Sequence, residues 1–306
     1  MYSTIEEFHA SLECGNRPPS FHGVLDTSDA YRDETTELMV FTIHDHTGSL
    51  SISCEEWWYP HYEEQDGNLV NLWPRSDKDH VSGQPIHLEP IIDVEGRPNG
   101  IRHLRGDTEQ TANLLARMVG LRDRLRTPSF QVFLDRVLGP TGHGLEFLQA
   151  PASTKYHHRE VGGLLKHSVE VAEAVEAAIG ILSVGPLQAD SAIVTALIHD
   201  LGKLAPQGPD KDLVPFMSDE HDRLIEYSAA EALLNLRMES SEAYHALLYL
   251  IKGFEHGDWY NCPLAALIRA CDATSARGDV VQRGLSRRKT DSRWLKVRHH
   301  RPIYHC

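Results

Sequence analysis

One stretch of the chain, from Tyr156 to Leu204, concentrates side chains that could do chemistry. It places histidines, an aspartate and a lysine among apolar residues with helical spacing: His157, His158, His167, His199, Asp200 and Lys203. Burying imidazoles and a carboxylate in a helical core costs free energy unless they find partners. A divalent cation satisfies both kinds of side chain, because aspartate offers a hard oxygen and neutral histidine a nitrogen. The stretch therefore predicts a metal site.

Two predicted helices must position these side chains. Apolar residues recur at helical intervals between Leu164 and Leu182, with His167 among them. Residues 192–198 are apolar on every side, which predicts a central helix that ends directly in His199 and Asp200. A metal at the end of that helix could be reached by both of these residues and by His167. Lys203, one turn beyond His199, is placed to meet a phosphate oxygen.

The order of these residues resembles the HD-domain metal-dependent phosphohydrolases. A histidine is followed about thirty residues later by HDLGK and then by a distant aspartate, and the similarity covers about Glu146 to Ala276. The resemblance implies an all-α helical bundle in which Asp272, in the amphipathic segment LIRACDATSA, completes the metal ligands His167, His199 and Asp200. It also implies that Lys203 and His158 neutralise phosphate charge.

Within that superfamily, the block FLQAPASTKYHHREVGGLLKHSVEVA is similar to two groups. One is the YhaM-type 3′-to-5′ exonucleases, which carry an OB fold ahead of the HD domain. The other is the MobH-type relaxases with TraI-like HD domains. Those relaxases usually have three successive histidines, whereas here Tyr156 precedes a pair.

The resemblance also bears on how many ions bind. In two-metal relatives Asp200 would bridge both ions, and further histidines would come from two later regions, here represented by His221 and by His256 in KGFEHGDW. His157 and His158, in the loop before the first helix, are expected to contact phosphate or a second metal. We expect one or two divalent ions, with manganese favoured and magnesium, iron, zinc and nickel as alternatives.

Residues 1–105 have the pattern of a mostly β domain. The segments FHGVLD, ELMVFTIHD and GSLSISCEEWW alternate apolar and polar residues, and HDHTG predicts a turn between two of them. Residues 84–104 predict a further pair of strands around Gly96, and residues 61–83 predict a loop insertion. Together they predict a small β-barrel, and FTIHDHTGSLSI resembles OB folds. Five aromatic residues could stack on bases or anchor the core: Trp57, Trp58, Tyr59, Tyr62 and Trp73.

The predicted fold class is therefore multidomain α and β: an OB-like β-barrel over residues 1–105, a helical HD-domain bundle over 106–282 and a basic tail over 283–306. Residues 107–138 predict two amphipathic helices separated at Thr127 and Pro128. The net charge is −14, and residues 1–105 hold 19 acidic but only 7 basic side chains. Because this region is acidic, any binding of nucleic acid must depend on local contacts. The tail is one candidate, and a solvated terminus is its alternative.

Several functional classes find no support in the sequence. No apolar run is long enough to span a membrane and the first residues lack a signal-peptide pattern, so we expect a soluble cytoplasmic protein with no membrane partner. The five cysteines lack C-x-x-C spacing, which favours reduced thiols. The chain contains no P-loop, dinucleotide fingerprint or G-x-S-x-G motif. Phosphoester hydrolysis is the remaining expectation.

The leading hypothesis is a metal-dependent phosphodiesterase that degrades single-stranded RNA or DNA from the 3′ end, because an OB-like module precedes a YhaM-like HD domain. A MobH-like DNA-processing protein and a small-nucleotide phosphohydrolase are the enzymatic alternatives. A non-catalytic binding module, whose metal only stabilises the bundle, is the alternative from another class. The sequence leaves homo-oligomerisation open.

Overall fold

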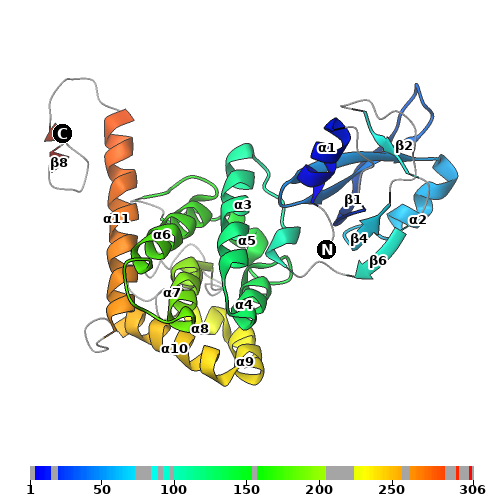
Figure 1. Ribbon diagram of the computed structural model, residues 1–306. Coiled ribbons are helices and arrows are strands. Elements are labelled where there is room, and N and C mark those ends of the chain that lie inside the picture. Colours follow the sequence, from blue (N-terminus) through cyan, green and yellow to red (C-terminus); the bar gives the residue numbers. More distant parts are fainter. Residues whose placement is uncertain are drawn as a thin grey trace, which may run out of the picture. The chain divides into compact units, whose positions relative to one another are not determined.

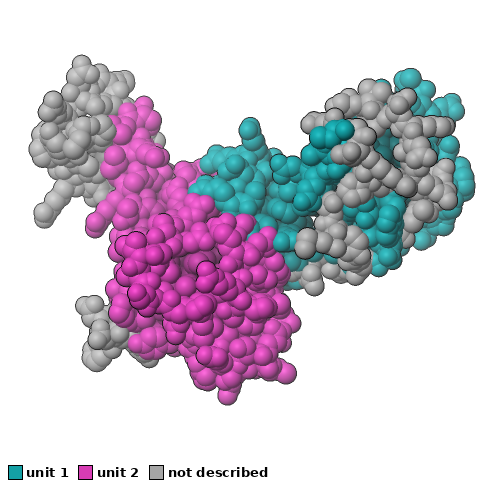
Figure 2. All heavy atoms as spheres, viewed as in Figure 1, with its two compact units in different colours: residues 1–119, 138–144 teal, residues 120–137, 145–306 magenta. Residues whose placement is uncertain are grey.

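The computed structural model describes residues 4–14, 20–73, 84–88, 92–96, 100–153, 157–204, 224–256, 262–286, 294–295 and 303–304. The chain divides into two compact units (Figure 2). Unit 1 comprises residues 1–119 and 138–144, and unit 2 comprises residues 120–137 and 145–306. The boundary expected near Gly106 lies within unit 1.

Unit 1 is built on a six-stranded sheet that curls into a half-barrel (Figure 1). Its strands are β1 (Phe21–Arg32), β2 (Met39–Asp45), β3 (Gly48–Cys54), β4 (Leu69–Leu72), β5 (Ile86–His87) and β6 (Ile92–Gly96). They lie in the order β5-β3-β2-β1-β4-β6, and all neighbours are antiparallel except β3 and β5. The expectation of a β-rich first region followed by a helical one is confirmed.

The β2–β3 turn predicted from HDHTG is held by one buried carboxylate. Asp45 Oδ1 accepts hydrogen bonds from the backbone N–H groups of Thr47 and Gly48, at 2.7 and 3.2 Å. Asp45 Oδ2 accepts a third from Ile5 N–H at 3.0 Å, at the start of α1 (Ile5–Glu13). Ile5 and Phe8 of this helix are buried in the sheet core. Asp45 therefore fixes the hairpin and anchors the helix together.

Two predictions for residues 61–104 were wrong. The expected loop insertion contains β4, whose residues are all buried and pair with both β1 and β6. A strand buried on both faces loses the alternation by which strands are recognised, and Asn71 interrupts its apolar run. The expected strand pair around Gly96 also does not form, because Ile101–His103 beyond the turn is a 3-10 helix and β6 pairs with β4 instead. Strand partners this distant in sequence are not specified by a local pattern.

The aromatic residues of unit 1 serve mainly as anchors. Tyr62, in α2 (Tyr59–Glu63), is fully buried in the core, and Trp58 and Tyr59 pack partly buried against it. Trp57 is 67% exposed and Trp73 is 36% exposed. Of the side chains considered for base stacking, these two are the most exposed.

His103 should make unit 1 sensitive to acid. Burial lowers its pKa to about 4, with neighbouring His22 and His46 adding to the effect, and its Nδ1 accepts the Gly100 N–H at 3.2 Å. The unfolded chain binds this proton near pH 6.5, so the stability contributed by neutral His103 is complete above pH 6.5 and is lost as the pH falls toward 4. We expect the melting temperature of the His103→Asn variant to decline less than that of wild type across this window. The exposed His61→Asn should follow wild type, and a His103→Asn curve parallel to wild type would contradict the assignment.

Unit 2 is helical. The two units divide within α3 (Glu109–Arg124). The helices that follow are α4 (Pro128–Leu138), α5 (Gly144–Gln149), α6 (Gly163–Ile179), α7 (Pro186–Ile198), α8 (Ile225–Ser228), α9 (Ala230–Glu239), α10 (Ser241–His256) and α11 (Pro263–Ser286). Residues 190–198 of α7 are all buried, and α7 packs against α6, α10 and α11 (Figure 1). The predicted central helix is confirmed, and so is the break between α3 and α4. A buried carboxylate, Asp190, accepts the N–H groups of Arg126 and Thr127 at this break.

Beyond Ser286 the structure describes two short antiparallel strands, β7 (Trp294–Leu295) and β8 (Ile303–Tyr304). The basic tail expected from Arg283 thus begins inside α11. In the described part of the chain no helix is both long and apolar enough to cross a membrane. The four described cysteines are free thiols.

Candidate metal centre

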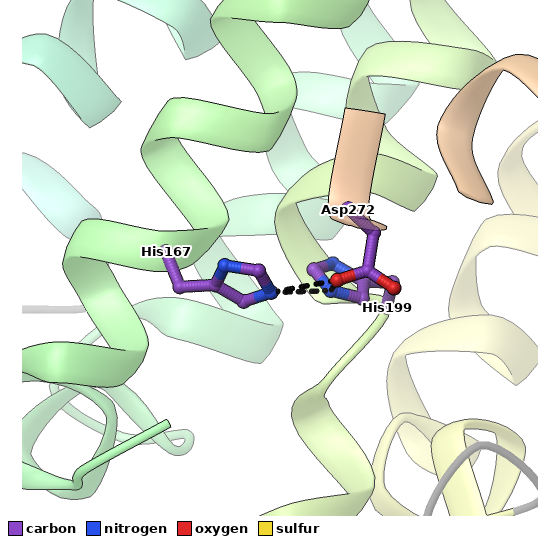
Figure 3. A group of neighbouring side chains, drawn as sticks. All are labelled: His167, His199 and Asp272. Atoms are coloured by element: carbon purple, nitrogen blue, oxygen red, sulfur yellow. Dashed lines mark hydrogen bonds and ion pairs between the residues drawn. The ribbon is translucent and has the colours of Figure 1, made fainter. Parts of the chain in front are cut away.

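Three side chains from three helices meet at one point in unit 2. His167 comes from α6, His199 caps the C-terminal end of α7 and Asp272 comes from α11 (Figure 3). His167 Nε2 lies 3.3 Å from His199 Nε2 and 3.0 Å from Asp272 Oδ1, and the latter is 3.8 Å from His199 Nε2. Both histidines are buried, and the group could hold a metal ion. The predicted convergence of separated helices on one site is therefore present.

Asp200 and Lys203 complete the surroundings of this group. Asp200 Oδ2 lies 3.6 Å from His167 Nε2 and 3.5 Å from His199 Nε2, so it faces both imidazoles. The same oxygen accepts a hydrogen bond from Lys203 Nζ. The short helical turn Leu201–Leu204 brings the lysine back onto the aspartate. Lys203 is thus held at the rim of the cluster by a carboxylate that itself faces the metal-binding atoms.

The hydrogen-bond partners of the two histidines define where their protons lie. His199 Nδ1 is 2.8 Å from the Ala196 carbonyl oxygen, which can only accept, so Nδ1 carries the hydrogen. His167 Nδ1 is 3.0 Å from Ser275 Oγ, and that hydroxyl donates its hydrogen to Glu170 Oε2 at 2.7 Å. The Ser275 oxygen therefore accepts from His167 Nδ1–H. Each neutral imidazole then presents an unprotonated Nε2.

These protonation states decide whether the side chains can act as ligands of a metal ion. Two Nε2 lone pairs and the carboxylates of Asp200 and Asp272 converge, and all of them are electron-pair donors. Burial lowers the pKa of His167, which favours its neutral, ligating form. Lys203 offsets part of the charge of Asp200, and a metal ion among the remaining donors would offset the repulsion between them. The mixture of imidazole nitrogen and carboxylate oxygen fits a divalent transition metal.

His157 lies beside this cluster. Its ring centroid is 5.0 Å from that of His167, and its Nε2 is buried with no hydrogen-bond partner among the described residues. Burial lowers its pKa to about 4, and the nearby His167 and Lys203 contribute in the same direction. A neutral imidazole with a free nitrogen at this position remains a candidate for contact with substrate or metal.

His158 occupies a different environment from the one expected. It is 1% exposed, and its Nε2 lies 3.3 Å from both Glu170 Oε2 and Ser275 Oγ. Its backbone N–H donates to Asp279 Oδ2 at 2.9 Å. The predicted role of His158 in phosphate contact gains no support from this buried position.

The sequence did not identify the residues that hydrogen-bond to His158 and His167 on the side away from Asp272. They are Glu170 of α6 and Ser275 and Asp279 of α11. A signal did exist, because Glu170 lies three positions after His167, and Ser275 and Asp279 lie three and seven positions after Asp272. Such spacings keep side chains on the helix face that carries the candidate metal ligand. Glu170 has a lowered pKa: burial would raise it, but hydrogen bonds from His158 and Ser275 outweigh that effect.

The Gly162-Gly163 pair shapes the loop that carries His157 and His158. Gly162 has a left-handed backbone with φ of +76°, which favours glycine. A Cβ on Gly163 would lie 2.0 Å from the His158 carbonyl oxygen, so only a residue without one fits this approach. The same carbonyl accepts the Ala152 N–H at 2.9 Å. These contacts hold the loop against the start of α6.

Replacing Gly163 with alanine should force this loop away from the helix. We expect a loss of about 1–3 kcal/mol in the free energy of unfolding, the usual cost of overpacking, read as a lower melting temperature. Gly180→Ala, at the other end of α6, is the matched control, because its Cβ would meet only the Ala177 carbonyl at an ordinary 3.4 Å. Equal melting temperatures for the two variants would contradict the proposed close approach.

By analogy with two-metal relatives, His221 and His256 are the predicted ligands of a second metal, and the structure describes only one of them. His221 lies outside the described residues. His256 ends α10 as predicted, 42% exposed, with Nε2 3.8 Å from Glu255 Oε2. In the described part of the chain, it belongs to neither group of side chains close enough to share an ion.

Comparisons of the chain with protein-family models, with curated proteins and with solved structures found no match.

Proposed function

We propose that the protein is a metal-dependent phosphohydrolase whose centre is formed by His167, His199, Asp200 and Asp272. The observation that carries the proposal is that the Nε2 atoms of His167 and His199 meet the Asp272 carboxylate, while Asp200 Oδ2 faces both imidazoles. A divalent cation bound there supplies Lewis acidity toward water and phosphoryl oxygens.

The residues of the chain perform the remaining tasks. His167 and His199 are held in the ligating tautomer by Ser275 and the Ala196 carbonyl, so no reorientation is needed when an ion binds. Asp200 and Asp272 bring two negative charges, which balance a divalent cation. Lys203 Nζ, within hydrogen-bond reach of Asp200, can neutralise a phosphate oxygen at the edge of the cluster.

For the substrate we propose single-stranded nucleic acid, cleaved from the 3′ end. The support is the order of modules, a curled β-sheet unit before the helical unit, together with the resemblance of FTIHDHTGSLSI to OB folds. Exposed Trp57 offers an aromatic face for a base. The acidic balance of residues 1–105 argues for recognition by local contacts rather than by general electrostatic attraction.

A substrate panel tests the proposal. Single-stranded RNA and DNA labelled at the 5′ end should shorten progressively in the presence of manganese and remain intact with a chelator. Circular supercoiled DNA and small nucleotides belong in the same panel. Nicked circles without shortening would favour a relaxase-type reaction, and turnover of small nucleotides alone would reject the nuclease assignment. No hydrolysis of any phosphoester would reject the enzyme.

A further inference from the structure

A second cluster lies behind His167 and shares none of the four proposed ligands. It consists of His158, Glu160 and Asp279, each of which offers one ligand atom within 4.8 Å of the others. His158 Nδ1 lies 3.9 Å from Glu160 Oε1 and 3.8 Å from Asp279 Oδ1. His158 and Asp279 are buried, whereas the side chain of Glu160 is 41% exposed. The cluster is thus buried on the side of His158 and Asp279 and open to solvent on the side of Glu160.

The proton on the His158 ring can be placed from its neighbours. The Ser275 hydroxyl hydrogen is committed to Glu170, so the Nε2 of His158, 3.3 Å from Glu170 Oε2, donates its hydrogen to that carboxylate. His158 Nδ1 is then an unprotonated nitrogen. It is buried and has no hydrogen-bond partner among the described residues. A cation bound among the three groups would satisfy this buried lone pair and both carboxylates at once.

The chain also holds His158 in an uncommon conformation. Its φ is +44°, a left-handed value that residues with a Cβ rarely adopt. The backbone is fixed on both sides, because the N–H of His158 donates to Asp279 and its carbonyl accepts from Ala152. Strain of this kind persists only where surrounding contacts impose it. Here those contacts aim Nδ1 between Glu160 and Asp279.

We propose that His158 Nδ1, Glu160 and Asp279 form a second divalent cation site, with zinc or manganese as the ion. One nitrogen and two carboxylate oxygens match the preference of these metals. Metal–ligand distances of about 2.0–2.2 Å place two ligands of one ion up to about 4 Å apart, in line with the spacing from His158 Nδ1 to the two oxygens. The exposed side of Glu160 leaves room for water as a further ligand.

Two basic side chains border this second site. Arg283 pairs with Asp279 Oδ2, at 2.6 Å, and leaves Oδ1 directed toward His158 Nδ1. Lys166 Nζ lies 3.4 Å from Glu160 Oε1, at the more exposed side of the cluster. Lys166 therefore competes with the ion for Glu160, whereas Arg283 holds Asp279 in place for it.

The second site is connected to the first through hydrogen bonds. His158 Nε2 contacts Glu170, Glu170 accepts from Ser275, and Ser275 accepts from His167. An ion on His158 Nδ1 would draw electron density from the ring and strengthen its Nε2–H donation to Glu170. The ion would thereby fix the loop and the back of His167 without touching substrate, which makes its role structural.

Zinc uptake by the metal-stripped full-length protein tests the proposal, measured by equilibrium dialysis and elemental analysis. Wild type should bind two equivalents. Glu160→Gln should lose one of them, or bind it at least roughly 10-fold more weakly, the smallest loss typical of altered metal surroundings. Asp272→Asn should lose the other, and the exposed Glu231→Gln should keep both. Glu160→His, which restores a ligand atom, should retain more zinc than Glu160→Gln.

Wild-type stoichiometry and affinity in Glu160→Gln would overturn the second site, and so would uptake of a single equivalent that depends on Asp272 alone. Equal loss in Glu160→Gln and Glu160→His, with melting temperatures below wild type, would assign Glu160 a packing role instead. The result does not depend on the proposed hydrolysis. A protein without phosphodiesterase activity would still take up the equivalent that requires Glu160.

Discussion

The Asp272→Asn variant should lose manganese-dependent phosphodiester hydrolysis by at least about 1,000-fold. A catalytic metal contributes several kcal/mol of charge stabilisation in the transition state, and each 1.4 kcal/mol corresponds to about tenfold in rate. Asparagine keeps the shape of the side chain but removes the negative charge that lies 3.0 Å from His167 Nε2. Initial rates on labelled single-stranded RNA and DNA, at several manganese concentrations, measure the effect.

The folded state should survive this change. Burial and the nearby Asp200 would raise the pKa of Asp272, but the contacts with His167 and His199 outweigh them and lower it, so the charge stabilises the metal-free fold. Removing it should lower the metal-free melting temperature slightly and should reduce the increase that manganese produces in wild type. Glu231→Gln, an equivalent charge change on the exposed first turn of α9, should behave as wild type. Hydrolysis by Asp272→Asn within a few-fold of wild type would exclude the cluster as the catalytic centre.

The sequence predicts which histidines of the candidate metal centre face the interior, because these residues sit in strong local patterns. His167 lies on the apolar face of an amphipathic helix, and His199 follows a helix that is apolar on all sides, so both had to face the interior. The position of Asp272 needed the family resemblance as well, since nothing local distinguishes it from other polar residues on α11. That the three meet within coordinating distance follows from packing of α6, α7 and α11, which no local pattern specifies.

The sequence does not predict the features that depend on tertiary contacts. The sequence predicts a loop where β4 forms, because burial on both faces removes alternation and the partners β1 and β6 are distant in sequence. His158 looked like a loop histidine at the surface. Its burial depends on the left-handed turn at Gly162 and on a carboxylate more than a hundred residues away, Asp279. Neither relation leaves a periodic signal in the chain.

Replacing Ser275 with alanine should weaken manganese binding by roughly 10–100-fold, the usual cost of losing a partner that orients a metal ligand. Ser275 contacts no metal-binding atom. Its oxygen accepts from His167 Nδ1–H and its hydrogen goes to Glu170, so the hydroxyl fixes both the tautomer and the rotation of the imidazole. Without it, His167 can place its proton on Nε2 and donate to Asp272, which removes a ligand and neutralises part of another.

The way the hydrolysis rate depends on manganese concentration distinguishes a positioning role for Ser275 from a structural one. In Ser275→Ala the manganese concentration for half-maximal hydrolysis should rise in step with the weaker binding, while the rate at saturating manganese returns to within a few-fold of wild type. Ser286→Ala, on the same helix with its hydroxyl bonded to the Arg283 carbonyl, should leave both quantities unchanged. A lower saturating rate with unaltered metal affinity would place Ser275 in the chemistry itself. Unchanged metal dependence and rate would mean that the Ala196 carbonyl on His199, without help from Ser275, is enough to set the geometry of the site.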